Sequence, residues 1–572
     1  MPHRSYLFSL RIAHALRESC ISESYTLRRL SKDLLAGVTV GIIAIPLAMA
    51  LAIASGVPPQ YGLYTAVVAG LLIPLLGGSR YSISGPTAAF VVVLAPITHH
   101  YGLGGLLLAT LLSGGILISM ALLRLGRFIA YIPEAVTLGF TAGIAVVIAS
   151  LQIKDLLGLQ IATQPEHFID KMALLASHLG EATWPSMSVA LVTLAMLLLW
   201  PRLRTPIPAH LPAIIGGALV AWLLSRYGFS VDTIGSRFSY LLPDGTTGHG
   251  IPPYLPHWVW PWSQPGPDGA PLTLDWKTLR DLLPAAFAIA MLGAIESLLC
   301  AVILDGITGK RHSANSELLG QGIGNIVTPF FGGITATAAI ARSVANFRAG
   351  AESPLSGVIH ALVVLLGLIA LAPLLAYLPM AAMAALLLIV AWNMSEMPKA
   401  LHLLKTSPRG DIWVFITCFA LTVLFDMVLA ITAGIVIAAL LFIKEIAEMT
   451  KVTDISEQRK WVPEPLPPHW GVYKISGPLF FAAADRIFGE LSLLCAAKSG
   501  IILHMEGVTL LDAGGLAALT KLIAKCEKSH TQLVLTELQF QPLKTLAKAD
   551  IRPIPGVTAY YGTLPEALGS VQ

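Results

Sequence analysis

The chain has 572 residues, of which 55% are hydrophobic and only 12% are charged. Soluble domains carry about a quarter charged residues, so this composition excludes an ordinary soluble protein and indicates a membrane protein. The formal net charge of +4 is too small to indicate a nucleic-acid-binding protein.

The first 33 residues form a basic, weakly amphipathic segment before the first apolar run. This segment lacks the apolar core and small-residue cleavage site of a signal peptide. Residues 34–449 then contain about fourteen apolar runs, two of them short, which predict a polytopic helical membrane domain. The runs lie near residues 34–54, 61–77, 86–97, 103–123, 131–151, 184–200, 210–227, 279–303, 317–331, 337–347, 355–376, 378–394, 411–429 and 430–449.

Basic residues indicate which loops face the cytoplasm. The loops after even-numbered runs carry arginines and lysines such as Arg80, Arg202 and Lys310. The loops after odd-numbered runs are nearly free of them, with Lys154 and Lys171 as exceptions. Because basic residues concentrate in cytoplasmic loops, we expect both termini to face the cytoplasm.

Three short motifs recur in the same order in the two halves of the membrane domain, which indicates an internal repeat. The pairs are "IPLLGG" at 73–78 with "TPFFGG" at 328–333, "TAA" at 87–89 with 337–339, and "AYIP" at 130–133 with "AYLP" at 376–379. Since seven spans is an odd number, the second copy must be inverted in the membrane. Inverted repeats are typical of secondary transporters, which bind substrate at the repeat interface.

The stretch "RYSISGPTAAF", residues 80–90, predicts the start of a half-helix inside the membrane. Pro86 suits a first helical turn, and Ser84 and Gly85 give a polar, permissive approach. The counterpart is "ITATAAIARSVANF" at 334–347. Two facing half-helix N-termini would present free N–H groups and positive dipole ends, which form an anion site. The alternative is a cytoplasmic loop end followed by an imperfect span.

Two of the charged residues within predicted spans are candidate functional groups. Arg342, on the second half-helix, would bind a carboxylate or sulfate bidentately if it faces the gap. The alternatives are that Arg342 extends to the cytoplasmic edge or pairs with Glu296. Glu296 must be protonated, paired or cation-bound in its span, so it is a candidate proton carrier. The alternative is a structural acid satisfied by donors of the neighbouring half-helix.

Residues 450–468 form a polar, Pro-rich linker, and residues 469–572 predict a small cytoplasmic α/β domain. Strands alternate there with helices, as in other α/β domains. We expect strands at 470–476, 500–508 and 531–538, and helices at 483–498, 513–529 and 541–549.

No enzyme motif is visible in the sequence. The stretch "GITGK" lacks the spacing of a P-loop, and no G-x-S-x-G occurs. The five cysteines include no C-x-x-C pair and no histidine at metal-binding spacing. We therefore expect a protein that is not an enzyme and has no cofactor or metal.

Three motifs in the membrane domain resemble the SulP anion transporter family, and the terminal domain resembles the STAS domain of that family. The motifs are "AIPLAMALAIASGVPPQYGLYTA", "GGSRYSISGPTAAF" and "GNIVTPFFGGITATAAIARSVANFRAG". Three further stretches are most similar to the bacterial family members that carry C4-dicarboxylates. These are "MLGAIESLLCAV", "SANSELLGQGIGNI" and "AALLLIVAWNMSE".

The resemblance implies a seven-plus-seven inverted repeat, divided into core and gate domains, that works by an elevator-like motion in a bacterial inner membrane. It places the anion between the starts of the third and tenth spans, with the first span lining the pocket. Carried onto this chain, these positions are Pro46, Leu47, Leu51, Ser84, Gly85, Pro86, Thr87, Ala341, Arg342 and Ser343.

The resemblance also bears on substrate and coupling. Family members that move bicarbonate with sodium carry Asp at the position of Glu296 and Thr at that of Cys300, so this chain favours protons. We expect proton-coupled transport of C4-dicarboxylates such as succinate, fumarate or aspartate, with sulfate or bicarbonate as the alternative. Nucleobase permeases share the inverted-repeat plan, but Arg342 and the domain after His469 argue against them. A membrane-tethered sensor with the STAS domain as output is a further alternative.

In the STAS domain, the loop that can be phosphorylated in anti-sigma-factor antagonists reads "DAGG" here, from Asp512 through Gly514 and Gly515. It has no hydroxyl, which excludes phosphorylation at that site. Asp512 is expected to cap the following helix. The domain is either a scaffold for folding, trafficking or homodimer formation, or a docking site for a cytoplasmic partner. The resemblance favours acyl carrier protein as that partner.

Overall fold

The structure is a computed structural model that describes residues 10–127, 132–161, 164–165, 167–205, 207–242, 245–272, 274–425, 427–494 and 497–571. It contains two compact units, Met1–Ile435 and Val436–Gln572. The repeated motif at 130–133 falls partly outside the described residues.

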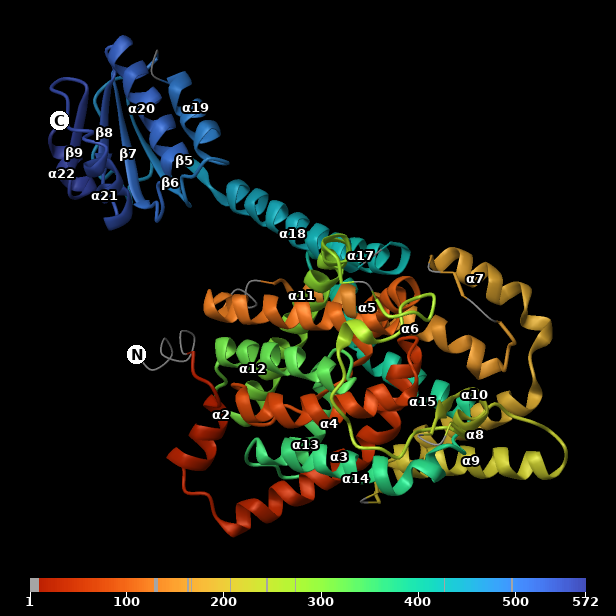
Figure 1. Cartoon of the computed structure of the whole chain (residues 1–572). Coiled ribbons are helices and arrows are strands. Elements are labelled where there is room, and N and C mark those ends of the chain that lie inside the picture. Colours follow the sequence, from red (N-terminus) through yellow and green to blue (C-terminus); the bar gives the residue numbers. More distant parts are fainter. Residues whose placement is uncertain are drawn as a thin grey trace. The chain divides into compact units, whose positions relative to one another are not determined.

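The first unit is built almost entirely from helices (Figure 1). Its long helices and the shorter ones between them are α2 (His14–Leu16), η1 (Arg17–Ser22), α3 (Leu27–Ala54), α4 (Pro59–Leu76), α5 (Ala88–Leu122), α6 (Glu134–Leu157), α7 (Phe168–Ser177), η3 (Leu179–Glu181), α8 (Trp184–Leu199), η4 (Trp200–Leu203), α9 (His210–Arg226), α10 (Ile234–Arg237), η5 (Pro261–Ser263), α11 (Trp276–Thr308), α12 (Ala314–Val327), η6 (Thr328–Phe331), α13 (Ile340–Arg348), α14 (Leu355–Leu375), α15 (Met380–Met394), α16 (Met397–Thr406), α17 (Arg409–Leu424) and α18 (Met427–Met449), which continues into the second unit.

Nine helices within the described residues are long and apolar enough to cross a bilayer. The third and fourth predicted spans are both contained in α5, which has two helical parts joined at Gly102. The φ of 67° at Gly102 is a left-handed conformation that glycine adopts without steric cost. Because of this break, the helical part that begins at Ala88 is short, as expected for a half-helix.

Two short strands, β1 (Ser84–Gly85) and β4 (Thr337–Ala338), pair antiparallel in the interior of the first unit. Their pairing keeps the backbone extended where the sequence predicts the beginning of each half-helix. Pro86 therefore precedes α5 and is not in its first turn, and Thr87 is the N-cap residue. The second half-helix begins at Ile340 and not at Thr337. Predicted and observed helix ends commonly differ by one or two residues. Here the pairing of β1 with β4 is the physical cause of the later helix starts.

The long segment between α9 and α11, which the sequence predicts as a loop, contains structure of its own. A hairpin pairs β2 (Ser239–Leu241) with β3 (Thr247–His249). Further along, the ring of Trp258 stacks on that of Phe330, with their centroids 4.8 Å apart. The segment thereby packs onto the residues that lead into β4.

The second unit is an α/β domain with a five-stranded sheet in the order β5-β6-β7-β8-β9, in which β5 is antiparallel and the others are parallel (Figure 1). Its elements are β5 (Lys451–Asp454), β6 (Trp470–Ser476), α19 (Ala484–Leu494), β7 (Gly500–Gly507), α20 (Ala513–Lys528), β8 (Gln532–Thr536), α21 (Phe540–Lys548), β9 (Thr558–Tyr561) and α22 (Leu564–Gly569). The segment expected to be a linker contributes β5. Such a short polar strand carries little hydrophobic pattern, and its pairing with β6 places it in the sheet.

Candidate functional site

The extended segment before the first half-helix is held by residues of the second half-helix. The amide of Ala339 donates to the carbonyl of Ile83 at 2.9 Å, and the amide of Ile83 donates to Ser343 Oγ at 2.9 Å. Asn346 Nδ2 donates to the carbonyl of Tyr81 at 3.0 Å. These bonds join the two repeats at the point where both half-helices begin.

The segment that leads into β4 is fixed by polar side chains of α12. Asn325 both donates to and accepts from the backbone of Ala336, each at 2.9 Å. Thr65 Oγ1 on α4 accepts from the amide of Ile334 at 2.7 Å. The spacing of Gln321 and Asn325 is typical of contacts between helices, yet in the structure both side chains donate to the irregular backbone at Ala336.

Glu317 on α12 fixes the chain that leads into β1. Its Oε2 accepts from the amides of Gly78 and Ser79 at 2.8 and 2.9 Å, and its Oε1 accepts from Ser297 Oγ at 3.1 Å. Glu317 is 1% exposed. Its position near the start of a helix is typical of a capping residue, but it caps the backbone after α4 instead. A Cβ on Gly77 would lie 2.8 Å from Glu317 Oε2, which explains the glycine in this motif.

Arg342 lies in the first turn of α13 with its guanidinium directed at the first half-helix. Its Nη2 donates to the carbonyl of Pro86 at 2.5 Å, and the side chain is 3% exposed. Within the residues that the structure describes, Nε and Nη1 are buried and have no hydrogen-bond partner. A Cβ on Gly85 would lie 3.1 Å from Nη1. Gly85 therefore provides room for the guanidinium.

This environment bears on two alternatives for Arg342. The guanidinium is buried, so it does not extend to the aqueous edge. Among the described residues no hydrogen bond joins it to Glu296, although the Glu296 carboxylate is near enough to act on it electrostatically. A buried arginine with unpaired N–H groups carries a large desolvation cost. An anion held at Nε and Nη1 would remove most of that cost and would match the fork of a guanidinium.

Glu296 on α11 is part-buried and accepts a hydrogen bond from Thr87 Oγ1 at 2.8 Å. The Thr87 hydroxyl therefore contacts the carboxylate and does not cap α5. The neighbouring residues Ile295 and Leu299 line a cavity between α11 and α6. The carboxylate thus lies at the N-terminus of the first half-helix.

The other predicted positions lie in different surroundings. Pro46, Leu47 and Leu51 are buried on α3, where Leu47 and Leu51 belong to the large apolar core cluster. Helix α3 packs against α13. Ser84 is buried, and its Oγ has no hydrogen-bond partner among the described residues. Ala341 is exposed, so it faces away from the buried side of α13.

His360 on α14 is a residue that the sequence reasoning did not identify. It is fully buried, and neither ring nitrogen has a hydrogen-bond partner within the described part of the chain. A Cβ built on Gly70 would contact both the Ser84 carbonyl at 3.3 Å and His360 Nδ1 at 3.4 Å, so the imidazole lies beside β1. A lone histidine in the apolar run "LSGVIHALVVLL" is the signal that would have drawn attention to it.

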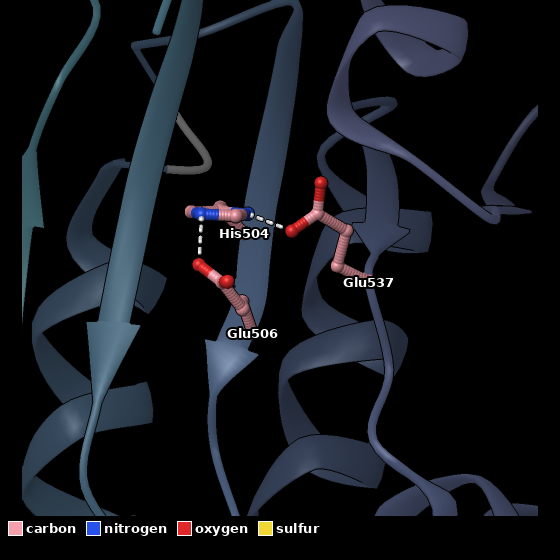
Figure 2. A group of neighbouring side chains, drawn as sticks. All are labelled: His504, Glu506 and Glu537. Carbon is pink, nitrogen blue, oxygen red and sulfur yellow. Dashed lines mark ion pairs between the residues drawn. The ribbon is translucent and has the colours of Figure 1, made fainter.

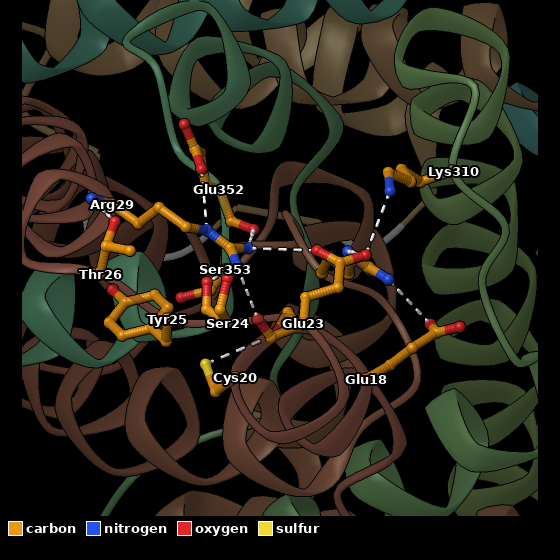
Figure 3. A network of polar contacts seen from close by, with 12 residues as sticks. Glu18, Cys20, Glu23, Ser24, Tyr25, Thr26, Arg29, Lys310, Glu352 and Ser353 are labelled. Atoms are coloured by element: carbon orange, nitrogen blue, oxygen red, sulfur yellow. Dashed lines mark hydrogen bonds and ion pairs between the residues drawn. The ribbon is translucent and has the colours of Figure 1, made fainter.

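A network of ion pairs connects the N-terminal segment to the loops before β1 and after α13 (Figure 3). Glu23 contacts Arg80 at 2.9 Å and Lys310 at 3.1 Å, and Arg29 contacts Glu352 at 2.8 Å. Burial raises the pKa of Glu23, but the hydrogen bonds from Arg80 and Lys310 outweigh this, so its pKa is lowered. One charged cluster therefore ties together the chain before β1, the loop between α11 and α12, and the segment after α13.

In the second unit, the "DAGG" loop makes close contact with the segment before α19. Asp512 caps α20, because its Oδ1 accepts from the amide of Gly515 at 2.7 Å. Its Oδ2 accepts from the amide of Phe481 at 3.1 Å. A Cβ on Gly514 would lie 2.7 Å from Phe481 Cα. Both carboxylate oxygens are thus used for structure.

Comparison with known proteins identifies both parts of the chain. Residues 30–418 match the Sulfate permease family, and residues 464–567 match the STAS domain. A relative from Bacillus subtilis (strain 168), named "Putative sulfate transporter YvdB", is 38% identical over 532 residues and covers 92% of this chain and 95% of the relative. "Bicarbonate transporter BicA" from Picosynechococcus sp. is 28% identical over 495 residues, with 82% of each chain covered.

A solved structure shows the same fold. The murine Solute Carrier 26 family member A9 anion transporter, solved in the inward-facing state, has a TM-score of 0.81 at 19% identity, with 98% of this chain and 94% of that chain covered. The predicted fold class, a polytopic helical transporter with a STAS domain, is confirmed.

Proposed function

Because the chain belongs to the Sulfate permease family, we propose that it transports a small oxyanion, which binds between β1, β4 and the N-termini of α5 and α13. The transporter works by an elevator-type alternating-access motion in a bacterial inner membrane, with both termini in the cytoplasm. It acts as a homodimer, and its STAS domain is a docking surface for a cytoplasmic partner of the acyl carrier protein type. The mechanism, the membrane, the orientation of the termini, the homodimer and the partner go beyond family membership. They are proposed from the sequence patterns described above.

The observation that carries this proposal is the buried guanidinium of Arg342, whose Nε and Nη1 have no hydrogen-bond partner among the described residues. It lies beside two helix N-termini, whose free N–H groups and dipoles favour negative charge. Ser84 adds a buried hydroxyl without a partner within the described residues. An oxyanion fits these donors, whereas a cation would be repelled by the guanidinium of Arg342.

The names of the relatives favour sulfate or bicarbonate as the substrate, since the relatives compared above are named as transporters of these anions. They give no support to the C4-dicarboxylates that the sequence motifs favoured. Succinate and fumarate remain the second candidates, because the stretch around Glu296 is similar to carriers of those acids. Uptake of labelled sulfate into proteoliposomes, competed in turn by bicarbonate, succinate, fumarate and aspartate, ranks these candidates.

The role of Arg342 is tested by Arg342→Ala, which removes the buried positive charge. We expect anion affinity to fall at least about tenfold, as for the loss of a charge-assisted bidentate contact, while the protein still inserts and folds. Arg348→Ala is the matched control, because it removes the same side chain from the exposed end of the same helix. Equal anion affinities for both variants would remove Arg342 from the site.

The coupling proposal assigns the co-transported proton to Glu296. Glu296→Gln keeps the size of the side chain but cannot release a proton, so we expect the loss of uptake driven by a pH gradient while anion exchange persists. Glu134→Gln, at the exposed start of α6, serves as the control. Retained gradient-driven accumulation in Glu296→Gln would refute proton coupling through this residue. If wild-type vesicles show no anion flux under any gradient, the sensor alternative is favoured.

A further inference from the structure

Two histidines are fully buried within the part of the chain that the structure describes, and their surroundings differ. His504, on β7 of the α/β unit, has a carboxylate beside each ring nitrogen (Figure 2): Nε2 lies 3.5 Å from Glu506 Oε2, and Nδ1 lies 3.4 Å from Glu537 Oε2. His360 on α14 has no hydrogen-bond partner at either ring nitrogen among the same residues. Buried polar groups almost always have a partner, so the surroundings of His360 are incomplete without one.

The imidazole of His360 lies beside β1, immediately before the first half-helix. A Cβ built on Gly70 would lie 3.4 Å from His360 Nδ1 and 3.3 Å from the carbonyl oxygen of Ser84. Both residues therefore approach α4 at the same point. Ser84 Oγ is also buried and has no hydrogen-bond partner in the described ranges. Two neighbouring residues at the proposed anion site thus each carry a buried polar side chain without a partner.

A row of buried polar side chains connects the region of His360 with the charged cluster of the N-terminal segment. Ser356 lies one helical turn before His360, on the same face of α14. Its hydroxyl donates to the Ser353 carbonyl at 3.0 Å, and Ser353 Oγ donates to Asp33 Oδ2. Asp33 Oδ1 accepts from the amide of Glu352 at 2.7 Å. Rows of polar and ionisable side chains inside membrane domains are typical of proton pathways.

Arg342 is the charged residue that acts electrostatically on the imidazole of His360. The groups that approach it from other sides carry no titratable side chain: these are the Gly357 carbonyl of α14, Gly41 of α3 and Gly70 of α4. While the anion site is empty, a proton on His360 would add a second positive charge near the guanidinium, and like charges repel strongly in a low dielectric. A bound anion reverses this balance because it attracts both charges. By thermodynamic linkage, the proton then strengthens anion binding by the same factor.

We propose that His360 is a proton-binding residue of the anion site. Its imidazole is neutral while the site is empty, accepts one proton when an anion binds beside Arg342, and releases the proton when the anion leaves. The proton passes between the ring and solvent along the polar row that ends at Glu352. Histidine suits this role because its charge changes near neutral pH. This role rests on the proposed function, and it adds a second protonatable group to Glu296.

The test measures proton uptake when an anion binds to the full-length protein in detergent. Sulfate is the probe, because it carries no proton near neutral pH, and a pH-indicator dye in weak buffer reports the protons that the protein takes up. Glu296→Gln removes the other candidate carrier. We expect this variant still to take up about one proton per bound sulfate, and Glu296→Gln combined with His360→Gln to take up none. Sulfate affinity should rise on acidification in the first variant and stay constant in the second.

His402→Gln in the Glu296→Gln background is the matched control, because it removes a histidine from an exposed position on α16 and should leave the uptake unchanged. His360→Asn replaces His360→Gln if size-exclusion chromatography shows misfolding. Equal proton uptake with and without His360 would overturn the role of this residue. Absence of proton uptake in Glu296→Gln would overturn it without any variant of His360. If the wild type binds neither sulfate nor a competing anion, the proposed function itself fails, and the role of His360 fails with it.

Discussion

Glu317 provides the most direct test of how the chain before the first half-helix is held in place. In Glu317→Ala, the amides of Gly78 and Ser79 lose their acceptor at a buried position, and the Ser297 hydroxyl loses its own. Each unsatisfied buried donor costs about 1–3 kcal/mol. For the two amides together we expect destabilisation of about 4 kcal/mol, or roughly 5 °C in melting temperature for a domain of this size.

The measurement is the fraction of folded protein in detergent after heating, followed by size-exclusion chromatography. Glu317→Gln retains one acceptor oxygen, so its melting temperature should fall between those of the wild type and Glu317→Ala. Glu134→Ala makes the same substitution at an exposed helix start and should change the melting temperature little. If Glu317→Ala melts no lower than Glu134→Ala, these hydrogen bonds do not stabilise the fold.

Two further predictions concern the space around Arg342 and the charged cluster at the N-terminal segment. Gly85→Ala places a Cβ 3.1 Å from Arg342 Nη1, so it should weaken anion binding several-fold. The affinity is measured by competition of anion uptake. Gly115→Ala is the control and should leave the affinity unchanged, because a Cβ there meets nothing within 4 Å. The pKa of Glu23 is lowered from its ordinary value of 4.5, and the hydrogen bond from Lys32 likewise lowers that of Glu352. These two carboxylates therefore stabilise the folded state fully at pH values above 4.5. This stabilisation is lost as the pH falls through their lowered pKa values. Hydrogen exchange of the N-terminal amides should accelerate on acidification and at high salt, and exchange independent of both would contradict the role of these ion pairs.

Much of the fold could be predicted from the sequence because its signals are local. Long apolar runs indicated the membrane domain, and alternating strands and helices indicated the C-terminal α/β domain. The repeated motifs around Thr87 and Thr337 indicated two half-helices, although their first residues were displaced by the pairing of β1 with β4. Arg342 and Glu296 drew attention because a charge inside an apolar span is costly. Their roles in anion binding and proton coupling stay predictions.

What only the tertiary structure decided is which residues meet across long stretches of chain. Hydropathy and spacing report the environment of a residue but do not name its partner. Nothing in the sequence paired Arg342 with the Pro86 carbonyl or Glu317 with the amides of Gly78 and Ser79, since each pair is more than 200 residues apart. His360 stands out in its apolar run, but the sequence does not show what surrounds it. Only folding buried its ring nitrogens without hydrogen-bond partners among the described residues, and the cost of such a site depends on surroundings that the chain creates by folding.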